Sequence, residues 1–189
     1  GATGSNIRAG SIGPAIPGYE LSIIDDDGNA LAPDQIGRLA VKGPTGCRYL
    51  DDPRQTDYVQ DGWNLTGDAC SMSADGYIAY HTRYDDMIIS AGYNISGLEV
   101  ENALLEHPKV VECAVIGEPD PERGQIVVAH VVLNDTGVGL DGMAHELQEH
   151  EKRAIAPYKY PRRIKFSNRL PRNESGKIQR FRLREAASN

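Results

Sequence analysis

Short apolar runs separated by turn residues fill the chain from Gly18 to about Tyr80. YELSIIDDDGNAL predicts a strand that enters a hairpin turn at Asp27-Gly28, and GRLAVKGP predicts a strand that ends at Gly43-Pro44. DGYIAYHTR predicts another strand after its own Asp-Gly turn. Because all these runs have the length of strands, we expect this first part of the chain to be mostly β.

The spacing of the apolar positions changes after Asp86. DMIISAGYNI predicts a strand and a loop, and SGLEVENALLEH predicts a helix with Ser96 and Glu99 as a capping box and Pro108 as its stop. The next runs, VVECAVIGEPD and GQIVVAHVVLND, predict two strands. The second is nearly all apolar and β-branched, which is typical of a strand inside a sheet.

A helix from about 142 to 156, a strand near 163–166, a polar loop and a short helix near 180–187 complete the pattern. This order of strands and helices is typical of a small α+β sandwich, so the predicted fold class is α+β. Residues 1–84 would form part of a small β subdomain, and residues 85–189 a compact domain with a short sheet flanked by helices. The boundary is placed at HTRYDD, where charge concentrates.

The composition predicts a soluble, globular, cytoplasmic protein. Its 189 residues are 40% apolar, which is enough to bury a core, and no apolar run is long enough to cross a bilayer. The three cysteines are odd in number and far apart, which favours neither a disulfide framework nor a zinc ribbon. The N-terminus lacks the regions of a signal peptide and an initiator Met, so we expect the protein's own N-terminus upstream of Gly1.

The charge is distributed unevenly, although the net charge is −7. Residues 159–184 hold ten Lys or Arg and a single acid, Glu174. Such a tail can favour a polyanion, and the alternative is a solvated surface of long side chains. Nucleic-acid sites usually add interleaved aromatic residues, and this tail offers only Tyr160 and Phe166, so nucleic acid is the weaker interpretation.

Familiar catalytic motifs fail on their spacing. Gly176-Lys177 is not the end of a P-loop, because Pro171 and Ile178 stand where that motif needs a glycine and a Ser or Thr. His145 and His150 are five residues apart, whereas the zinc pair of a metalloprotease needs a spacing of four. We therefore predict no metal site and no hydrolase chemistry.

Three polar clusters remain: GWNLTGDA, TRYDDMIISAGYNISGLEVE and LPRNESGKIQR. Alone, each has an ordinary structural explanation as a turn, a solvated loop or a hairpin tip. In this order and at these intervals they resemble the adenylate-forming superfamily of acyl-CoA synthetases, luciferases and peptide-synthetase adenylation domains. The resemblance covers nearly the whole chain and is strongest for ligases of aryl or medium-chain acids.

The resemblance implies an acid:CoA ligase. A small carboxylic acid would attack the α-phosphorus of ATP, supplied with Mg²⁺, to give an acyl-adenylate and pyrophosphate, and coenzyme A would then take the acyl group. Negative charge accumulates on oxygen atoms in the first step, so a cation that arrives when needed would help.

The resemblance also implies roles for five residues. Lys177 would be the catalytic cation, Asp68 would accept hydrogen bonds from the ribose hydroxyls of the nucleotide, and Arg83 would face its ribose and phosphates. Asp85 would be the hinge, near 83–86, about which the last hundred residues rotate between the half-reactions. Gly92 would line the tunnel for the pantetheine arm of CoA.

Two other classes of function stay open: an adenylation domain that loads a carrier protein, and a non-catalytic module that binds polyanions. No carrier domain follows Asn189, which favours CoA. The family's large N-terminal lobe would precede Gly1, so we expect the chain alone to be inactive. The context of Lys177 also resembles that of relatives silenced by a lysine acetyltransferase.

Overall fold

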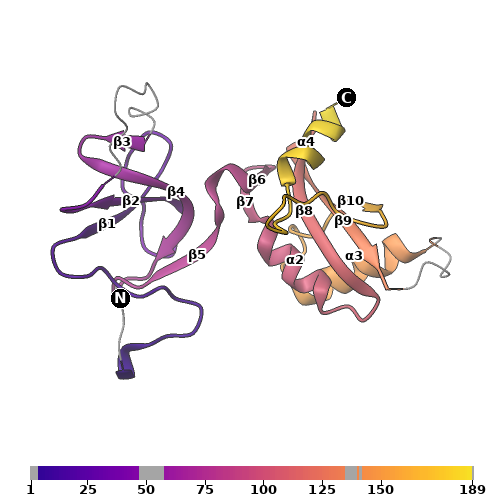
Figure 1. Cartoon of the computed structure of the whole chain (residues 1–189), viewed down its shortest axis with the longest axis horizontal. Coiled ribbons are helices and arrows are strands. Elements are labelled where there is room, and N and C mark those ends of the chain that lie inside the picture. The colour runs from indigo at the N-terminus through magenta and orange to yellow at the C-terminus, as the bar shows by residue number, and fades with distance from the viewer. Residues whose placement is uncertain (1–3, 47–57, 135–139, 141, 189) are drawn as a thin grey trace. The chain divides into compact units, whose positions relative to one another are not determined.

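The structure, a computed structural model, describes residues 4–46, 58–134, 140 and 142–188. The chain forms two compact units, Gly1–Asp85 and Asp86–Asn189 (Figure 1). This division falls one residue after the boundary predicted from the sequence. The assignment of that boundary as a hinge stays a prediction.

The first unit contains an antiparallel sheet in which the strand order is β1-β2-β4-β3, with β5 also paired to β4. A short 3₁₀ helix, η1 (Gly4–Asn6), precedes β1 (Glu20–Ile24), β2 (Gly37–Lys42), β3 (Val59–Gln60), β4 (Trp63–Met72) and β5 (Ile78–Arg83). The core of the sheet is formed by Ile23, Leu39, Cys70 and Ile78. The predicted strands are therefore present in this mostly β unit.

A bulge interrupts β4 at the sequence Thr66-Gly67-Asp68. Arg38 of β2 lies opposite Ala69, and Ala40 lies opposite Leu65, so β4 has two more residues than β2 over this interval. Gly67 has a φ of +74°, a backbone conformation that favours glycine. The sequence favoured a simple turn for these residues when taken alone, but they lie inside a strand.

The second unit contains a five-stranded sheet, three α-helices in its described part and one end of η2 (Tyr84–Asp86), a 3₁₀ helix that crosses the boundary. Its elements are β6 (Met87–Ser90), β7 (Tyr93–Ser96), α2 (Gly97–Leu105), β8 (Val110–Asp120), β9 (Gly124–Leu133), α3 (Met143–Ala154), β10 (Arg163–Phe166) and α4 (Arg180–Ser188). All strand pairs are antiparallel except β9 with β10. The predicted α+β class is confirmed. No helix in the described residues has both the length and the apolar character needed to span a membrane.

Alternate residues of β8 face opposite sides of this sheet. Cys113 and Val115 pack with α2 and α3 in one apolar cluster, whereas Ala114 and Ile116 pack with Leu183 of α4 in another. Helices α2 and α3 therefore cover one face and α4 covers the other (Figure 1). Because β8 pairs only with β9 among the described strands, it forms an edge of the sheet.

Residues 87–96 differ from the predicted strand and loop, because they form two strands in a tight hairpin. Ser90 pairs with Tyr93, which leaves Ala91 and Gly92 as the turn, and their φ angles are +49° and +81°. Two positive φ angles are typical of a type I′ turn. The sequence did not indicate this turn because Ala91 stands where Asn, Asp or Gly is usual.

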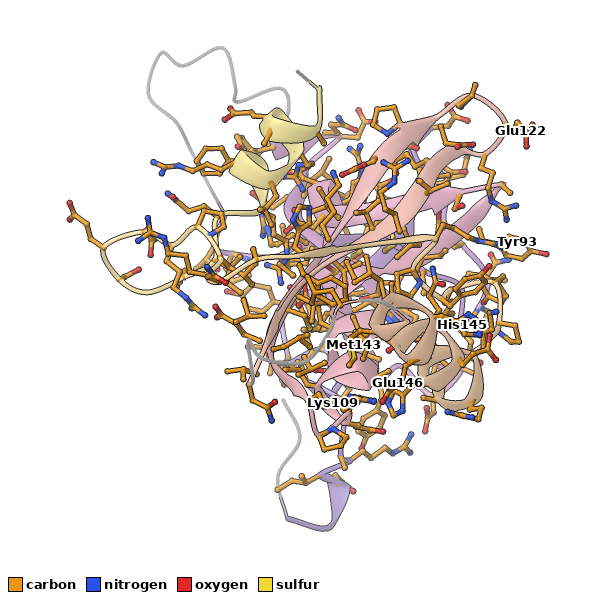
Figure 2. The ribbon with its side chains drawn as sticks, turned by 90° about the vertical axis from the view of Figure 1, so that its right-hand side faces the viewer. Tyr93, Lys109, Glu122, Met143, His145 and Glu146 are labelled. Atoms are coloured by element: carbon orange, nitrogen blue, oxygen red, sulfur yellow. The ribbon has the colours of Figure 1, made fainter. Side chains whose placement is uncertain are left out.

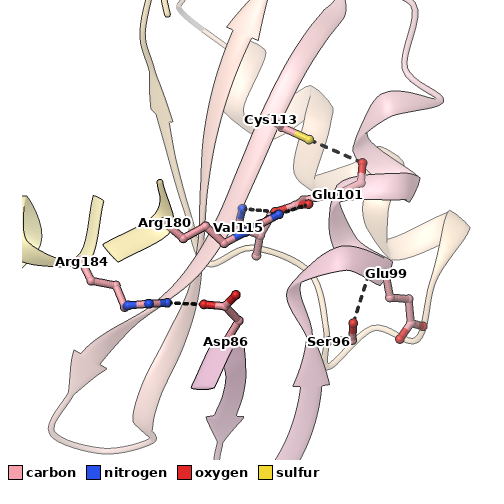
Figure 3. Close-up of polar contacts among 8 residues, drawn as sticks. All are labelled: Asp86, Ser96, Glu99, Glu101, Cys113, Val115, Arg180 and Arg184. Carbon is pink, nitrogen blue, oxygen red and sulfur yellow. Dashed lines mark hydrogen bonds and ion pairs between the residues drawn. The ribbon is translucent and has the colours of Figure 1, made fainter. Parts of the chain in front are cut away.

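Helix α2 begins at a side-chain cap, whereas Gly142, the N-cap of α3, makes no side-chain hydrogen bond. The hydroxyl of Ser96 accepts a hydrogen bond from the backbone N–H of Glu99, as predicted (Figure 3). The Glu99 carboxylate pairs with Lys159 instead of completing a capping box. In α3, Met143 is buried, and the Glu146 carboxylate accepts hydrogen bonds from Lys109 at 3.0 and 3.1 Å (Figure 2).

Candidate functional site

Lys177 lies near the end of a turn that is closed by an isolated β-bridge between Arg172 and Ile178. The side-chain oxygen of Asn173 accepts the backbone N–H of Lys177 at 2.8 Å, and the backbone N–H of Asn173 donates to the Lys177 carbonyl at 3.0 Å. Gly176 has a φ of +81°, which explains the glycine before the lysine. The turn therefore fixes the backbone of Lys177 and leaves its side chain exposed.

The Lys177 ammonium has no ion pair within the described part of the chain, unlike most of its basic neighbours. Six of the ten Lys and Arg residues between 159 and 184 form ion pairs with acids elsewhere in the second unit: Lys159 with Glu99, Arg163 and Lys165 with Glu118, Arg172 with Glu112, Arg180 with Glu101, and Arg184 with Asp86. The basic tail therefore largely neutralises acids of its own unit, which weakens the case for a polyanion surface.

Asp68 and Arg83 are cross-strand neighbours on β4 and β5. Arg83 donates from Nη1 to the Asp68 carboxylate at 2.8 Å and to the Thr66 carbonyl at 3.1 Å. The arginine is half-exposed, so this ion pair contributes little stability. Its effect is to hold two hydrogen-bonding groups side by side.

Gly67 is necessary for this arrangement, and this role was not predicted from the sequence. A Cβ at Gly67 would lie 2.5 Å from Nη2 of Arg83, so any side chain would displace the guanidinium. A pocket of about 230 Å³ opens beside it, lined by Arg38, Tyr58, Leu65, Gly67, Arg83, Tyr84 and Asp85. This volume is below the usual range for a pocket that encloses a whole ligand.

The residues around the boundary are held in different ways. Tyr84 donates its hydroxyl to Asp26 at 2.9 Å and lies under the Arg38 guanidinium, which fixes it in the first unit. Asp86 accepts a hydrogen bond from Arg184 at 2.7 Å, which fixes it in the second unit. Between them, Asp85 is exposed, and its carboxylate makes no hydrogen bond or ion pair with the residues that the structure describes.

Gly92 occupies the tip of the β6–β7 hairpin, and backbone contacts support this tip. The N–H of Ala91 donates to the Arg123 carbonyl at 2.8 Å, in the turn between β8 and β9. A Cβ at Gly92 would meet no atom within 4 Å. Within this unit, glycine is therefore favoured by the φ of +81° and not by crowding.

The buried thiols are poor nucleophiles. Burial raises the pKa of Cys70 to about 11 and that of Cys113 to about 12. Cys47 lies outside the described residues. Nucleophilic cysteine chemistry thus has no support from the described cysteines.

The structure brings the predicted residues together in two groups. The first unit holds Asp68, in the middle of β4, beside Arg83 at the end of β5, and Asp85 follows two residues later. The second unit holds Gly92 and Lys177 on separate loops. Their roles toward nucleotide and CoA stay predictions.

The chain is similar to known enzymes over nearly its whole length. Residues 99–177 match the AMP-binding enzyme C-terminal domain. The chain is 46% identical to human mitochondrial acyl-coenzyme A synthetase ACSM5, in an alignment that covers 96% of this chain and 33% of that protein.

Two solved structures share the fold. The anthranilate CoA ligase AuaEII in complex with anthranoyl-AMP is 37% identical, with a TM-score of 0.79 over 96% of this chain and 36% of that chain. The ATP-bound RpMatB-BxBclM chimera B1 is 34% identical, with a TM-score of 0.77 over 94% of this chain and 36% of that chain. The chain thus spans about a third of the length of the relatives it matches.

Residues 99–177 therefore belong to the family of AMP-binding enzyme C-terminal domains. Its homologues are acyl-CoA synthetases and CoA ligases. The family predicted from the three polar clusters is confirmed.

Proposed function

We propose that this chain is the C-terminal part of an ATP-dependent carboxylic acid:CoA ligase. The observation that carries the proposal is an exposed lysine without a partner in the described structure, held on a fixed turn in a domain of the adenylate-forming superfamily. Relatives named for acyl-CoA synthesis and a ligase crystallised with its acyl-adenylate support the same reaction. In this proposal the whole protein is an AMP-forming acid-thiol ligase, and the chain alone is inactive.

The residues of the chain would divide the work between the two half-reactions. Lys177 would place its ammonium beside the oxygens of the carboxylate and the α-phosphate, where negative charge develops as the C–O–P anhydride forms and pyrophosphate leaves. Asp68 would accept hydrogen bonds from the ribose hydroxyls, because the two oxygens of a carboxylate match the two hydroxyls of a diol. Arg83, already beside Asp68, would supply positive charge toward the same nucleotide.

The second half-reaction would use Gly92 and Asp85. The thiolate of CoA attacks the acyl carbon, a C–S bond forms, and AMP leaves with the electrons of the broken C–O bond. Gly92 would leave space for the pantetheine arm, and rotation about Asp85 would exchange the two loops. Within the described residues the Asp85 carboxylate has no hydrogen bond or ion pair, and its two neighbours are anchored, which supports this hinge.

The test uses the full-length protein with ATP, Mg²⁺ and a panel of aryl and medium-chain acids, with and without CoA. We expect pyrophosphate and acyl-adenylate with a preferred acid, and equal amounts of AMP and acyl-CoA when CoA is added, measured by mass spectrometry. Transfer of the acyl group to a carrier protein but not to CoA would favour the carrier-loading alternative. Absence of any AMP would contradict the ligase.

Three further parts of the proposal concern partners and location. Mg²⁺ would arrive with the phosphates of ATP. An acetyltransferase would be able to reach the exposed Lys177, and acetylation would remove the charge that the first step needs. We also propose a cytoplasmic location, in keeping with the free thiols Cys70 and Cys113, whereas the human relative is mitochondrial by name.

A further inference from the structure

A buried ion pair lies close to the turn that carries Lys177. Glu101 of α2 is 5% exposed, and Arg180 of α4 donates to its two carboxylate oxygens at 2.7 and 2.8 Å from Nη2 and at 3.1 Å from Nε (Figure 3). The same carboxylate accepts the backbone N–H of Val115 at 2.8 Å. Charge-assisted contacts of this kind hold a guanidinium in a defined position and orientation.

This ion pair connects the two faces of the sheet. Glu101 comes from the helix layer on one face, Arg180 starts the helix on the other, and Val115 belongs to β8, which is an edge strand in the described sheet. Arg180 therefore reaches round the edge of β8 to a carboxylate 79 residues earlier in the chain. The contact fixes the start of α4 against the rest of the unit.

Lys177 is three residues before Arg180, so its position depends on the same contact. Between them, Ile178 packs against the apolar cluster that contains Leu170 and Leu183. At the other end of the turn, Arg172 pairs with Glu112 of β8 and donates to the Gly176 carbonyl at 2.6 Å. An arginine at each end thus ties the turn to acids on neighbouring elements, while the lysine between them is exposed.

We infer that Glu101 and Arg180 are positioning residues for adenylate formation: they fix the base of the Lys177 turn and so set the place that the ammonium reaches. This inference rests on the proposed function. A buried carboxylate that loses its partner is strongly destabilising, which makes the position of Arg180 well determined in the folded unit. A displacement of about 1 Å in a catalytic group can cost about a hundredfold in rate, so loosening this base should slow the step that uses Lys177.

The test measures both half-reactions in the full-length protein carrying Arg180→Met. We expect adenylate formation, followed as pyrophosphate release, to fall about tenfold to a hundredfold in kcat, with the KM for ATP within about threefold of the parent value. Thioester formation from supplied acyl-adenylate should stay within about threefold, because that step does not use Lys177.

Two further variants separate positioning from stability. Arg182→Met is the matched control, since Arg182 is an exposed arginine on the same helix without an ion pair in the described residues, and it should leave both half-reactions unchanged. The double variant Glu101→Gln with Arg180→Met removes both charges, so no uncompensated buried charge remains. It should regain most of the melting temperature lost in Arg180→Met, while adenylate formation stays low.

The inference is wrong if adenylate formation recovers together with the melting temperature in the double variant, or if both half-reactions fall equally or neither falls. If Arg180→Met does not fold, the double variant and Arg180→Lys give the same decision, with a smaller loss expected for lysine. Lys177→Ala in the same series distinguishes failure of the proposed function from failure of the positioning inference. Normal adenylate formation in Lys177→Ala would refute the proposed function, whereas loss there with no loss in the Arg180 variants refutes only the positioning pair.

Discussion

The two loops of the second unit are built in opposite ways. The turn at 172–178 is tied down by arginine side chains at or next to its ends and presents an exposed, charged side chain. The hairpin tip at 91–92 is held by backbone hydrogen bonds and presents a residue without a side chain. The first arrangement places a charge accurately, and the second leaves space.

This contrast matches the two steps of the proposed reaction. Adenylate formation needs positive charge near developing negative charge, and thioester formation needs a path for a slender thiol arm. Both loops belong to one unit, so rotation about Asp85 would move them together. Damage to one loop should therefore affect one step and spare the other.

The largest expected effect is that of Lys177→Ala in the full-length protein. Removing the ammonium should lower the rate of adenylate formation by about 10² to 10³-fold, which is the usual cost of losing one electrostatic contact to a transition state. Pyrophosphate release measures this step. Thioester formation from supplied acyl-adenylate should continue at the parent rate, and an equal loss of both steps would contradict the role of Lys177.

Gly92→Ala should have a smaller effect than Lys177→Ala, and on the other step. A methyl group in the pantetheine path should slow thioester formation by about tenfold and spare adenylate formation. The positive φ adds roughly 1–2 kcal/mol of strain.

Gly142→Ala is the control for that strain. Gly142 has nearly the same φ, +83°, and also has no atom within 4 Å of an added Cβ, but it precedes α3. It should lose similar stability and keep both half-reactions. A similar loss of thioester formation in Gly142→Ala would show that strain, and not the CoA path, explains the effect at Gly92.

The smallest effect on either half-reaction is expected from Glu151→Gln. This variant tests whether a change in stability alone can cause the step-specific losses that we expect at the two loops. Glu151 of α3 is completely buried, and neither carboxylate oxygen has a hydrogen-bond partner among the described residues. Burial, with Glu106 and Glu99 nearby, raises the pKa of Glu151 to about 8.

The raised pKa of Glu151 determines how the stability of the folded chain changes with pH. The unfolded chain loses this proton near pH 4.5, whereas the folded chain keeps it until about pH 8, so the wild-type chain loses stability as the pH rises between these values. Glutamine does not titrate in this range. By pH 8 to 9 the free energy of unfolding of Glu151→Gln, relative to that of the wild type, should therefore have risen by roughly a few kcal/mol, as the size of the pKa shift implies. Urea unfolding at several pH values measures the difference, and a difference that does not change with pH would contradict the raised pKa.

Much of the fold could be predicted because its signals are local. Runs of a few residues were enough to predict strands β8, β9 and β10 and the helix cap at Ser96. These elements lie close to their predicted positions. The hairpin at Ala91 and the bulge at Gly67 were missed because their backbone conformations depend on pairing with neighbouring strands.

The support of the site was harder to predict. The three clusters indicated Lys177, Asp68 and Arg83, but nothing in the sequence indicated the contact of Glu101 with Arg180. These residues are 79 positions apart, and a glutamate in EVENALLEH resembles any solvent-facing residue of a helix. Only the packing of α2 and α4 on opposite faces of one sheet shows why that carboxylate is buried and paired.

The most direct test measures both half-reactions side by side in Lys177→Ala and Gly92→Ala of the full-length protein. We predict crossed losses: the lysine variant is deficient only in pyrophosphate release, and the glycine variant only in thioester formation. Parallel losses, with both variants deficient in the same step or equally in both, would contradict the division of the reaction between the two loops.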